Sequence, residues 1–168
     1  MKIQLLIGPI ASGKTSYCRN AARQGIICLN DDDIVNMLHG GDYTLYNSGL
    51  KLLYKSVENH VIATALSIQR TVIVDRGLNV SLVGRKRFIA LAQSFDVSIE
   101  AIVFKNEGPE VHAKRRTESD SRGHDYEYWK KVAEWHHSQY VEPTLSEGFD
   151  VVHHISFEEI QRGIYFTS

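Results

Sequence analysis

The sequence has few cysteines, no long apolar run and almost no net charge, and each shortage excludes a class of protein. Cys18 and Cys28 lack the spacing of a metal site, so we expect two reduced core thiols in a cytoplasmic protein. No apolar run approaches the roughly 20 residues that a membrane span needs. The formal charge of −1 excludes strong, indiscriminate electrostatic binding to nucleic acid but is compatible with a local basic site.

The start of the chain and its histidines extend these exclusions. Met1-Lys2 leads directly into an apolar segment, so we expect no signal peptide. The histidines include the adjacent pairs 136–137 and 153–154, whose side chains point in different directions, so we expect no histidine metal site. A chain of 168 residues is expected to form one domain, residues 1–168, around one core.

Five apolar segments alternate with helical patterns along the chain. The expected strands are Ile3–Ile7, Ile26–Leu29, Thr71–Val74, Ser98–Phe104 and Val151–Ile155. The expected helices are Ser16–Arg23, Ile34–Leu38, Leu50–Gln69, Ser81–Ser94, Glu110–Glu118, Asp125–Tyr140 and Phe157–Gly163, with an irregular segment over residues 39–49. Strands rich in Ile and Val are typical of a parallel sheet covered on both faces. The pattern predicts a doubly wound α/β fold, which binds ligands beyond the carboxyl ends of its strands.

The segment between the first strand and the first helix fits the pattern G-x-x-x-x-G-K-[ST] of phosphate-binding loops. Its residues are Gly8, Pro9, Ile10, Ala11, Ser12, Gly13, Lys14 and Thr15, followed by Ser16. The glycines allow a tight backbone turn, and the loop amides attract phosphate together with the helix N-terminus. We therefore expect the loop to bind ATP or another nucleoside triphosphate. Lys14 would bridge the β- and γ-phosphates, and the Thr15 hydroxyl would ligate Mg²⁺.

Acidic residues follow the second and third strands, at the sheet edge where the loop is expected. Asp31, Asp32 and Asp33 follow the second strand. Their spacing allows two roles equally, a helix cap or a base that accepts the proton of an attacking hydroxyl. Asp75 ends the third strand, where a carboxylate beside a phosphate loop typically holds Mg²⁺. We favour this metal role for Asp75 over a role in the following turn.

Arginines gather after the fourth strand, between Lys105 and Gly123. Most charge runs of this kind are only solvated helix surfaces. Beside a phosphate loop we favour a closing lid over approximately residues 107–140. In this lid, Arg122 and one of Arg115 and Arg116 would neutralise charge on the transferring phosphate.

Tyrosines are concentrated between the second strand and the third, at Tyr43, Tyr46 and Tyr54. Bases of a nucleic acid can stack on such rings. Core packing is the commoner use of aromatic side chains in helices. The sequence leaves both uses open.

In these segments and their order, the chain resembles the 5′-hydroxyl polynucleotide kinases of phages and of animal DNA-end-healing proteins. The segments that carry the resemblance are Gly8–Thr15, Leu29-Asn30-Asp31-Asp32, Val74-Asp75, Arg115–Arg122 and Glu142–Phe149. The family carries its general base on the Asp of an Asn-Arg-Asp sequence, so the resemblance implies that Asp32 is the base. It also implies that Arg122 is the lid arginine.

Two positions depart from the pattern of that family. Asp31 stands where the family usually has Arg, and Val35 stands where the phage enzymes place another Arg. A residue that would contact the acceptor or the transferring phosphate is therefore missing or supplied from elsewhere.

Taken together, these features predict an ATP- and Mg²⁺-dependent kinase with a P-loop kinase fold and an Arg-bearing lid. The favoured acceptor is the 5′-OH of a nucleic acid, as a short end or a single strand. A small-molecule kinase acting on a nucleoside, nucleotide, sugar, antibiotic or modified-base hydroxyl is the alternative. An ATPase switch without an acceptor is a third reading, in which Asp32 would only cap a helix. The sequence does not distinguish a DNA acceptor from an RNA acceptor or ATP from GTP as the donor, and it is compatible with any oligomeric state.

Overall fold

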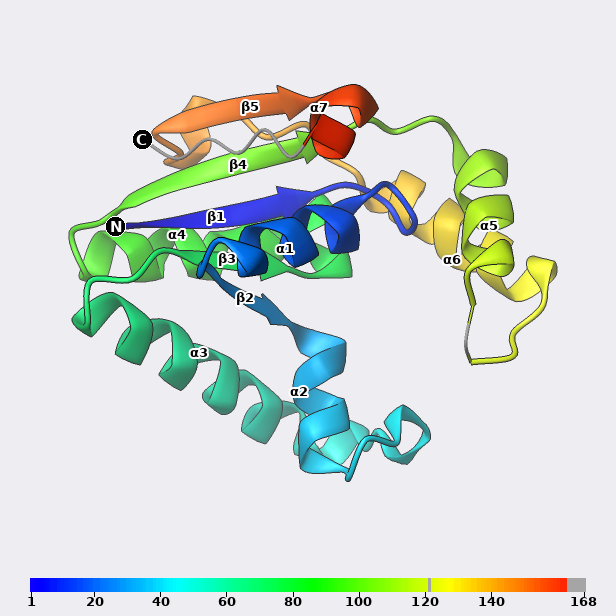
Figure 1. Cartoon of the computed structure of the whole chain (residues 1–168), viewed down its shortest axis with the longest axis horizontal. Coiled ribbons are helices and arrows are strands. Elements are labelled where there is room, and N and C mark those ends of the chain that lie inside the picture. The colour runs from blue at the N-terminus through cyan, green and yellow to red at the C-terminus, as the bar shows by residue number, and fades with distance from the viewer. Residues whose placement is uncertain (121, 163–168) are drawn as a thin grey trace.

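The five expected strands form a parallel sheet with the order β2-β3-β1-β4-β5 (Figure 1). The structure is a computed structural model and describes residues 1–120 and 122–162. The strands are β1 (Lys2–Ile7), β2 (Ile27–Asn30), β3 (Val72–Asp75), β4 (Ser98–Phe104) and β5 (Val151–Ile155). β1 and β3 are buried along their whole lengths, as strands covered on both faces must be. The predicted five-stranded parallel sheet is confirmed.

Helices cover both faces of this sheet. They are α1 (Lys14–Arg23), α2 (Asp31–Leu38), α3 (Lys51–Ser67), α4 (Leu82–Ser94), α5 (Pro109–Glu118), α6 (Tyr126–Gln139) and α7 (Phe157–Arg162). One face packs against Tyr17 of α1 and Ile160 of α7. The other face packs against Ile62 of α3 and Phe88 of α4. α5 and α6 lie together beyond the carboxyl ends of the strands, at the right of Figure 1.

The main departure from the predicted boundaries concerns α2, which begins at Asp31 rather than at Ile34. The three aspartates therefore form its first turn, where their negative charge interacts favourably with the helix dipole. Of the two roles left open for the aspartates, the structure does not bear out the cap, because the Asn30 side chain is the cap and accepts from the Asp32 amide at 2.8 Å. The Asp32 carboxylate is consequently not used in capping.

The other described helix and strand ends agree with the expected ones or shift by one or two residues. α1 begins at Lys14, so the last loop residues are already helical. The segment expected to be irregular holds two short 3₁₀ turns, Tyr43–Leu45 and Ser48–Leu50, the second of which runs one residue beyond it. The predicted last helix ended at Gly163, which lies outside the described residues.

Two buried polar side chains fix the edge of the sheet where the site lies. Asn79 donates from Nδ2 to the carbonyl oxygens of Leu6 and Val74, near the ends of β1 and β3. Arg85 is fully buried and forms two hydrogen bonds with Glu147, at 2.8 and 2.9 Å. Because Glu147 belongs to the segment 142–149, this ion pair gives the segment that carried part of the resemblance a structural role.

None of the helices within residues 1–120 and 122–162 combines the length and the apolar content that crossing a membrane requires.

Candidate active site

The predicted phosphate loop lies between β1 and α1, and its lysine is folded back onto it. Lys14 Nζ donates to the carbonyl oxygens of Gly8 and Pro9, at 2.8 and 2.6 Å. The Lys14 side chain is buried, and burial lowers its pKa, while the Asp75 carboxylate acts in the opposite direction. The ammonium group is thus held close to the loop backbone, where it has lost much of its hydration.

Neighbouring side chains hold the loop in place. A side chain at Gly8 would meet Phe104 Cβ and Ser12 Oγ at 2.8 Å, so only glycine fits there without a shift. The Ile10 amide donates to His136 Nδ1 at 3.2 Å, and His136 comes from α6. Burial lowers the pKa of His136 to about 4, so the ring is neutral at pH 7 and can accept this bond. Sequence reasoning missed this role because nothing local marks His136 as a loop partner.

Thr15 and Asp75, the predicted metal ligands, line the same cavity of 280 Å³. Asp75 is buried, and burial raises its pKa, although Lys14 and a hydrogen bond from Asn30 act to lower it. The free thiols of Cys18 and Cys28 line this cavity too; they are half-buried and pack against the edge of the hydrophobic core rather than within it. The described residues contain no group of three or more His, Cys, Asp or Glu side chains arranged to hold a metal ion.

Two oxygen ligands nevertheless fit Mg²⁺, which usually keeps several waters and takes its other ligands from substrate phosphates. The Ser12 hydroxyl, also in the loop, is buried and has no hydrogen-bond partner among the described residues. Such an orphaned donor inside the loop is compatible with a phosphate ligand. Thr15, Asp75 and the loop are therefore the residues that could hold a nucleotide and its metal.

The predicted base and the predicted lid arginine meet. Arg122 Nη2 donates to Asp32 Oδ2 at 2.5 Å, although the residues are 90 positions apart. The Arg122 guanidinium also lies over the Tyr43 ring, 4.0 Å from its centre. Burial first, and the Asp32 carboxylate next, raise the pKa of Tyr43 to about 12, so its hydroxyl stays protonated.

The other two lid arginines differ in where they point. Arg115 pairs with Glu107 and is largely exposed. Arg116 lies over the Trp129 ring, 4.6 Å from its centre, and its charge is near enough to Lys14 to help lower the pKa of that lysine. Of the pair that the sequence left open, Arg116 is thus the one nearer the phosphate loop.

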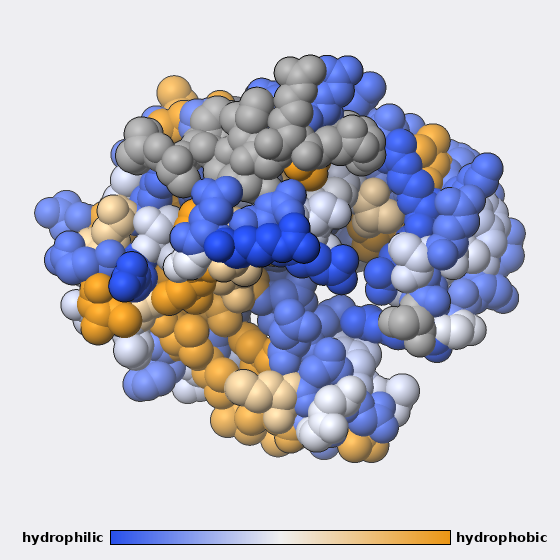
Figure 2. Space-filling model, viewed as in Figure 1, coloured by the Kyte–Doolittle hydropathy of each residue, from blue (hydrophilic) through white to orange (hydrophobic). Residues whose placement is uncertain are grey.

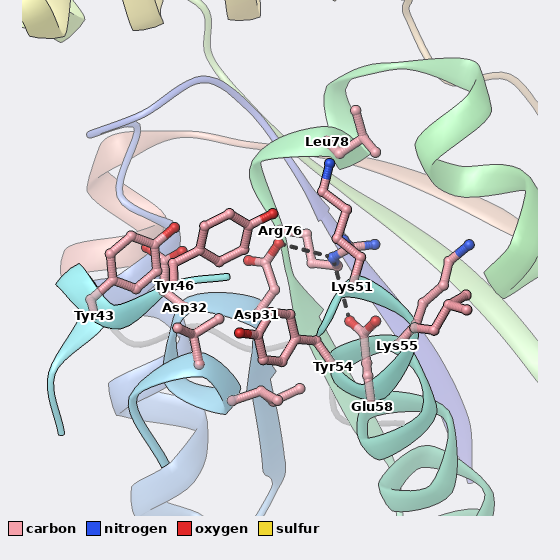
Figure 3. Close-up of a pocket in the computed structure, with 13 residues that line it drawn as sticks. Asp31, Asp32, Tyr43, Tyr46, Lys51, Tyr54, Lys55, Glu58, Arg76 and Leu78 are labelled. Atoms are coloured by element: carbon pink, nitrogen blue, oxygen red, sulfur yellow. Dashed lines mark hydrogen bonds and ion pairs between the residues drawn. The ribbon is translucent and has the colours of Figure 1, made fainter. Parts of the chain in front are cut away.

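A second, larger cavity of 410 Å³ opens beside Asp32 (Figure 3). Tyr43, Tyr46 and Tyr54 line it together with Val35. In the view of Figure 1, Figure 2 shows the surface hollowed between the part that carries α2 and the part that carries α5 and α6, with hydrophilic residues along the hollow. All three tyrosines that the sequence left unassigned thus line the cavity, and Tyr54 is also a buried member of the hydrophobic core.

An ion-pair network that the sequence did not reveal lies in the wall of this cavity. Arg76 Nε lies 3.1 Å from Asp31 Oδ2 and 3.5 Å from Glu58 Oε1. Glu58 also pairs with Arg87 of α4. Burial raises the pKa of Asp31, and Arg76 acts to lower it. Asp31, the first departure from the family pattern, thus faces an arginine that comes from another element.

A family model described as an AAA domain matches residues 3–143. No curated protein matches the chain. A chain in the structure of the Pnkp1/Rnl/Hen1 RNA repair complex aligns at 21% identity with a TM-score of 0.66, over 89% of this chain and 46% of that one. A fungal RNA kinase aligns at 17% identity with a TM-score of 0.64, over 92% and 38%. A gluconokinase from Sinorhizobium meliloti 1021 aligns at 14% identity with a TM-score of 0.57, over 96% and 88%.

The chain spans less than half the length of the first two of these relatives. At such identities the likenesses establish the fold: a five-stranded parallel sheet flanked by helices, as in P-loop kinases. Family and fold together imply that the chain binds a nucleotide. The family model covers most of the chain, and the chain therefore belongs to the AAA domain family and has the α/β fold of P-loop kinases.

Proposed function

We propose that the protein is an ATP- and Mg²⁺-dependent kinase that transfers the γ-phosphate to a hydroxyl, namely the 5′-OH end of a nucleic acid. The observation that carries the proposal is the contact between Asp32 and Arg122, beside a phosphate loop and an open cavity. Phosphoryl transfer needs a group that orients the nucleophile and a cation that stabilises the transferring charge. Asp32 can orient the nucleophile, and Arg122 is the cation.

On the donor side, the loop amides and Lys14 would hold the phosphates of ATP. Lys14 would exchange the Gly8 and Pro9 carbonyls for phosphate oxygens, which are stronger partners for a buried ammonium. Thr15 and Asp75 would hold Mg²⁺, which when bound neutralises charge on the β- and γ-phosphates.

On the acceptor side, Asp32 would accept the proton of the attacking hydroxyl. In the free protein its carboxylate is occupied by Arg122. When ATP binds, Arg122 gains a phosphate partner, and its movement towards that phosphate would free Asp32 for the acceptor. Arg116 would add positive charge near the loop, and residues 107–140 would act as the lid.

The tyrosines that line the larger cavity, Tyr43, Tyr46 and Tyr54, support a nucleic-acid acceptor. Bases stack on aromatic rings whatever the sequence of the nucleic acid. The likeness to the Pnkp1/Rnl/Hen1 RNA repair complex and to a fungal RNA kinase supports it too. A small-molecule or modified-base kinase is the second candidate. The 410 Å³ cavity is of the size that small ligands occupy, and a gluconokinase shares the fold.

The ATPase switch loses its main support. It requires Asp32 to serve only as a helix cap, whereas the cap is Asn30. The Asp32 carboxylate instead faces Arg122 at the wall of a cavity. A protein without an acceptor has no need of this arrangement.

Incubation with γ-labelled ATP tests the proposal, using one oligonucleotide with a 5′-OH and the same oligonucleotide with a 5′-phosphate. We expect label on the first only. If label enters a nucleoside or another small alcohol but neither oligonucleotide, the small-molecule kinase replaces the proposal. If ATP is hydrolysed and no acceptor is labelled, the switch replaces it.

A further inference from the structure

Arg76 is a largely buried arginine with unused hydrogen-bonding capacity in the wall of the larger cavity. It follows β3, and only 16% of its side chain is exposed. Its Nε atom faces Asp31 and Glu58, as the dashed lines in Figure 3 show. Within the described residues, Nη1 and Nη2 donate no hydrogen bond to the protein. Four N–H donors therefore remain for a ligand in the cavity.

The two carboxylates next to Arg76 orient its guanidinium group. Asp31 comes from α2, and Glu58 comes from α3 and is further held by Arg87. Neither Nη1 nor Nη2 of Arg76 is sealed off from solvent without a partner among the described residues, so water can satisfy these donors in the free protein and a ligand in the cavity can replace it. A planar guanidinium matches the geometry of phosphate by donating two parallel hydrogen bonds. The site is thus built for an oxyanion.

The other charges around the cavity agree with an anionic ligand. Lys51 and Lys55 lie one turn apart on α3 and both line the cavity. Both are exposed, and neither pairs with a carboxylate in the part of the chain that the structure describes. Each of the three lining carboxylates, by contrast, faces an arginine. The unoccupied charge in the cavity is therefore positive.

Arg76 also stands close to the place where the family pattern lacks its arginines. Position 31 is the aspartate to which Arg76 is paired. Position 35 is a buried valine in the cavity wall, so no cation comes from there. The negative charge at position 31 is thus balanced by an arginine that follows β3.

We propose that Arg76 binds a phosphate of the acceptor, adjacent to the target hydroxyl, and so selects phosphate-bearing acceptors over neutral alcohols. The inference rests on the proposed function, because it takes the larger cavity as the acceptor site. Lys51 and Lys55 would attract the phosphates of the nucleotides that follow in the same nucleic acid.

A pair of oligonucleotides tests this inference by binding alone, without ATP. Both carry a 5′-OH; the first internucleotide linkage is a phosphodiester in one and a neutral methylphosphonate in the other. We expect wild-type protein to bind the phosphodiester about 10- to 100-fold more tightly, as a charge-assisted hydrogen-bond pair implies. Arg76→Gln should remove most of this preference by weakening only the phosphodiester. Arg70→Gln, which removes an exposed arginine outside both cavities, should leave the preference intact.

Equal affinity of the wild type for both oligonucleotides would overturn the inference, and so would an Arg76→Gln variant that weakens both equally. If Arg76→Gln does not fold, Arg76→Lys decides. It keeps the charge but loses the planar fork, so the preference should fall several-fold, and an unchanged preference would contradict the inference. Transfer of label is measured separately. Binding with the expected preference but no transfer contradicts the proposed function alone, whereas no binding of either oligonucleotide contradicts both.

Discussion

The phosphate loop and the larger cavity lie side by side, but their polar groups are occupied to different degrees. In the loop, Lys14 bonds to loop carbonyls and the Ile10 amide bonds to His136. In the cavity, Lys51 and Lys55 have no carboxylate partner among the described residues, and Arg76 uses one of its nitrogens. Lys14 and the Ile10 amide of the loop are thus already paired within the protein, with the Ser12 hydroxyl as the exception, whereas the cavity still offers the donors of its cations to a ligand.

This difference separates two tasks. A loop held by its own protein needs little reorganisation when phosphates arrive, which favours binding of a common donor. A cavity with unused cations and aromatic walls discriminates between ligands that do and do not satisfy them. We therefore place the choice of acceptor in the larger cavity and assign to the loop only the choice of a phosphorylated donor.

The largest effect is expected from Lys14→Met, which breaks the donor side. Transfer should fall by about 10²- to 10³-fold, as loss of a phosphate-stabilising cation implies. Stability without nucleotide should change by no more than about 1 kcal/mol, since a buried ammonium is unfavourable to begin with and its pKa is lowered by burial. Thermal melting with and without ATP checks this. Wild type should be stabilised by ATP, and an equal shift in the variant would contradict the role of Lys14.

A somewhat smaller effect is expected from Arg122→Gln, which acts between the two regions. Transfer should fall by about 100-fold, and ATP affinity should fall far less, because Arg122 exchanges its Asp32 partner for a phosphate when ATP binds. Stability should stay nearly unchanged, because the pair with Asp32 is partly exposed. Lys114→Gln is the matched control, an exposed charge on α5. Equal losses in both variants would show that only the general charge of the lid matters.

The smallest effect is a pH dependence of stability on the donor side. The pKa of His136 is about 4 in the folded protein against 6.5 for an ordinary histidine. Its contribution to stability is complete above pH 6.5 and is lost as the pH falls towards 4, because the unfolded chain takes up the proton first. His136→Asn keeps an acceptor for the Ile10 amide and does not titrate.

This variant should therefore lose about 2 kcal/mol less than wild type between pH 8 and pH 5. Denaturant unfolding of both proteins at the two pH values measures the difference. Parallel losses in the two proteins would rule out a buried neutral His136.

Local features of the sequence predicted the loop and the five strands, and the family resemblance singled out Asp32 and Arg122, whose direct contact was not foreseen. The strands were visible because continuous Ile and Val runs mark buried parallel strands. The start of α2 was missed because its apolar pattern begins only at Ile34, whereas the preceding turn is stabilised by charge and by the Asn30 cap. Patterns of apolar residues carry no information on such polar helix starts.

The acceptor side could not be predicted in the same way. Asp31, Glu58, Arg76 and Arg87 come from four elements, and nothing in their spacing couples them. His136 likewise contacts Ile10 of the loop, although the two residues are 126 positions apart in the sequence. Such contacts depend on the packing of helices around the sheet, which a single sequence specifies only through the whole fold.

The most direct test of the account compares Asp32→Asn with Asp33→Asn, measuring ATP affinity and transfer to a 5′-OH oligonucleotide. Both aspartates lie in the first turn of α2, but Asp32 lines the larger cavity and Asp33 the smaller one. We predict unchanged ATP affinity in Asp32→Asn, a transfer rate lower by about 100-fold or more, and a much smaller loss in Asp33→Asn. Undiminished transfer by Asp32→Asn would contradict the central claim that this carboxylate serves the acceptor hydroxyl.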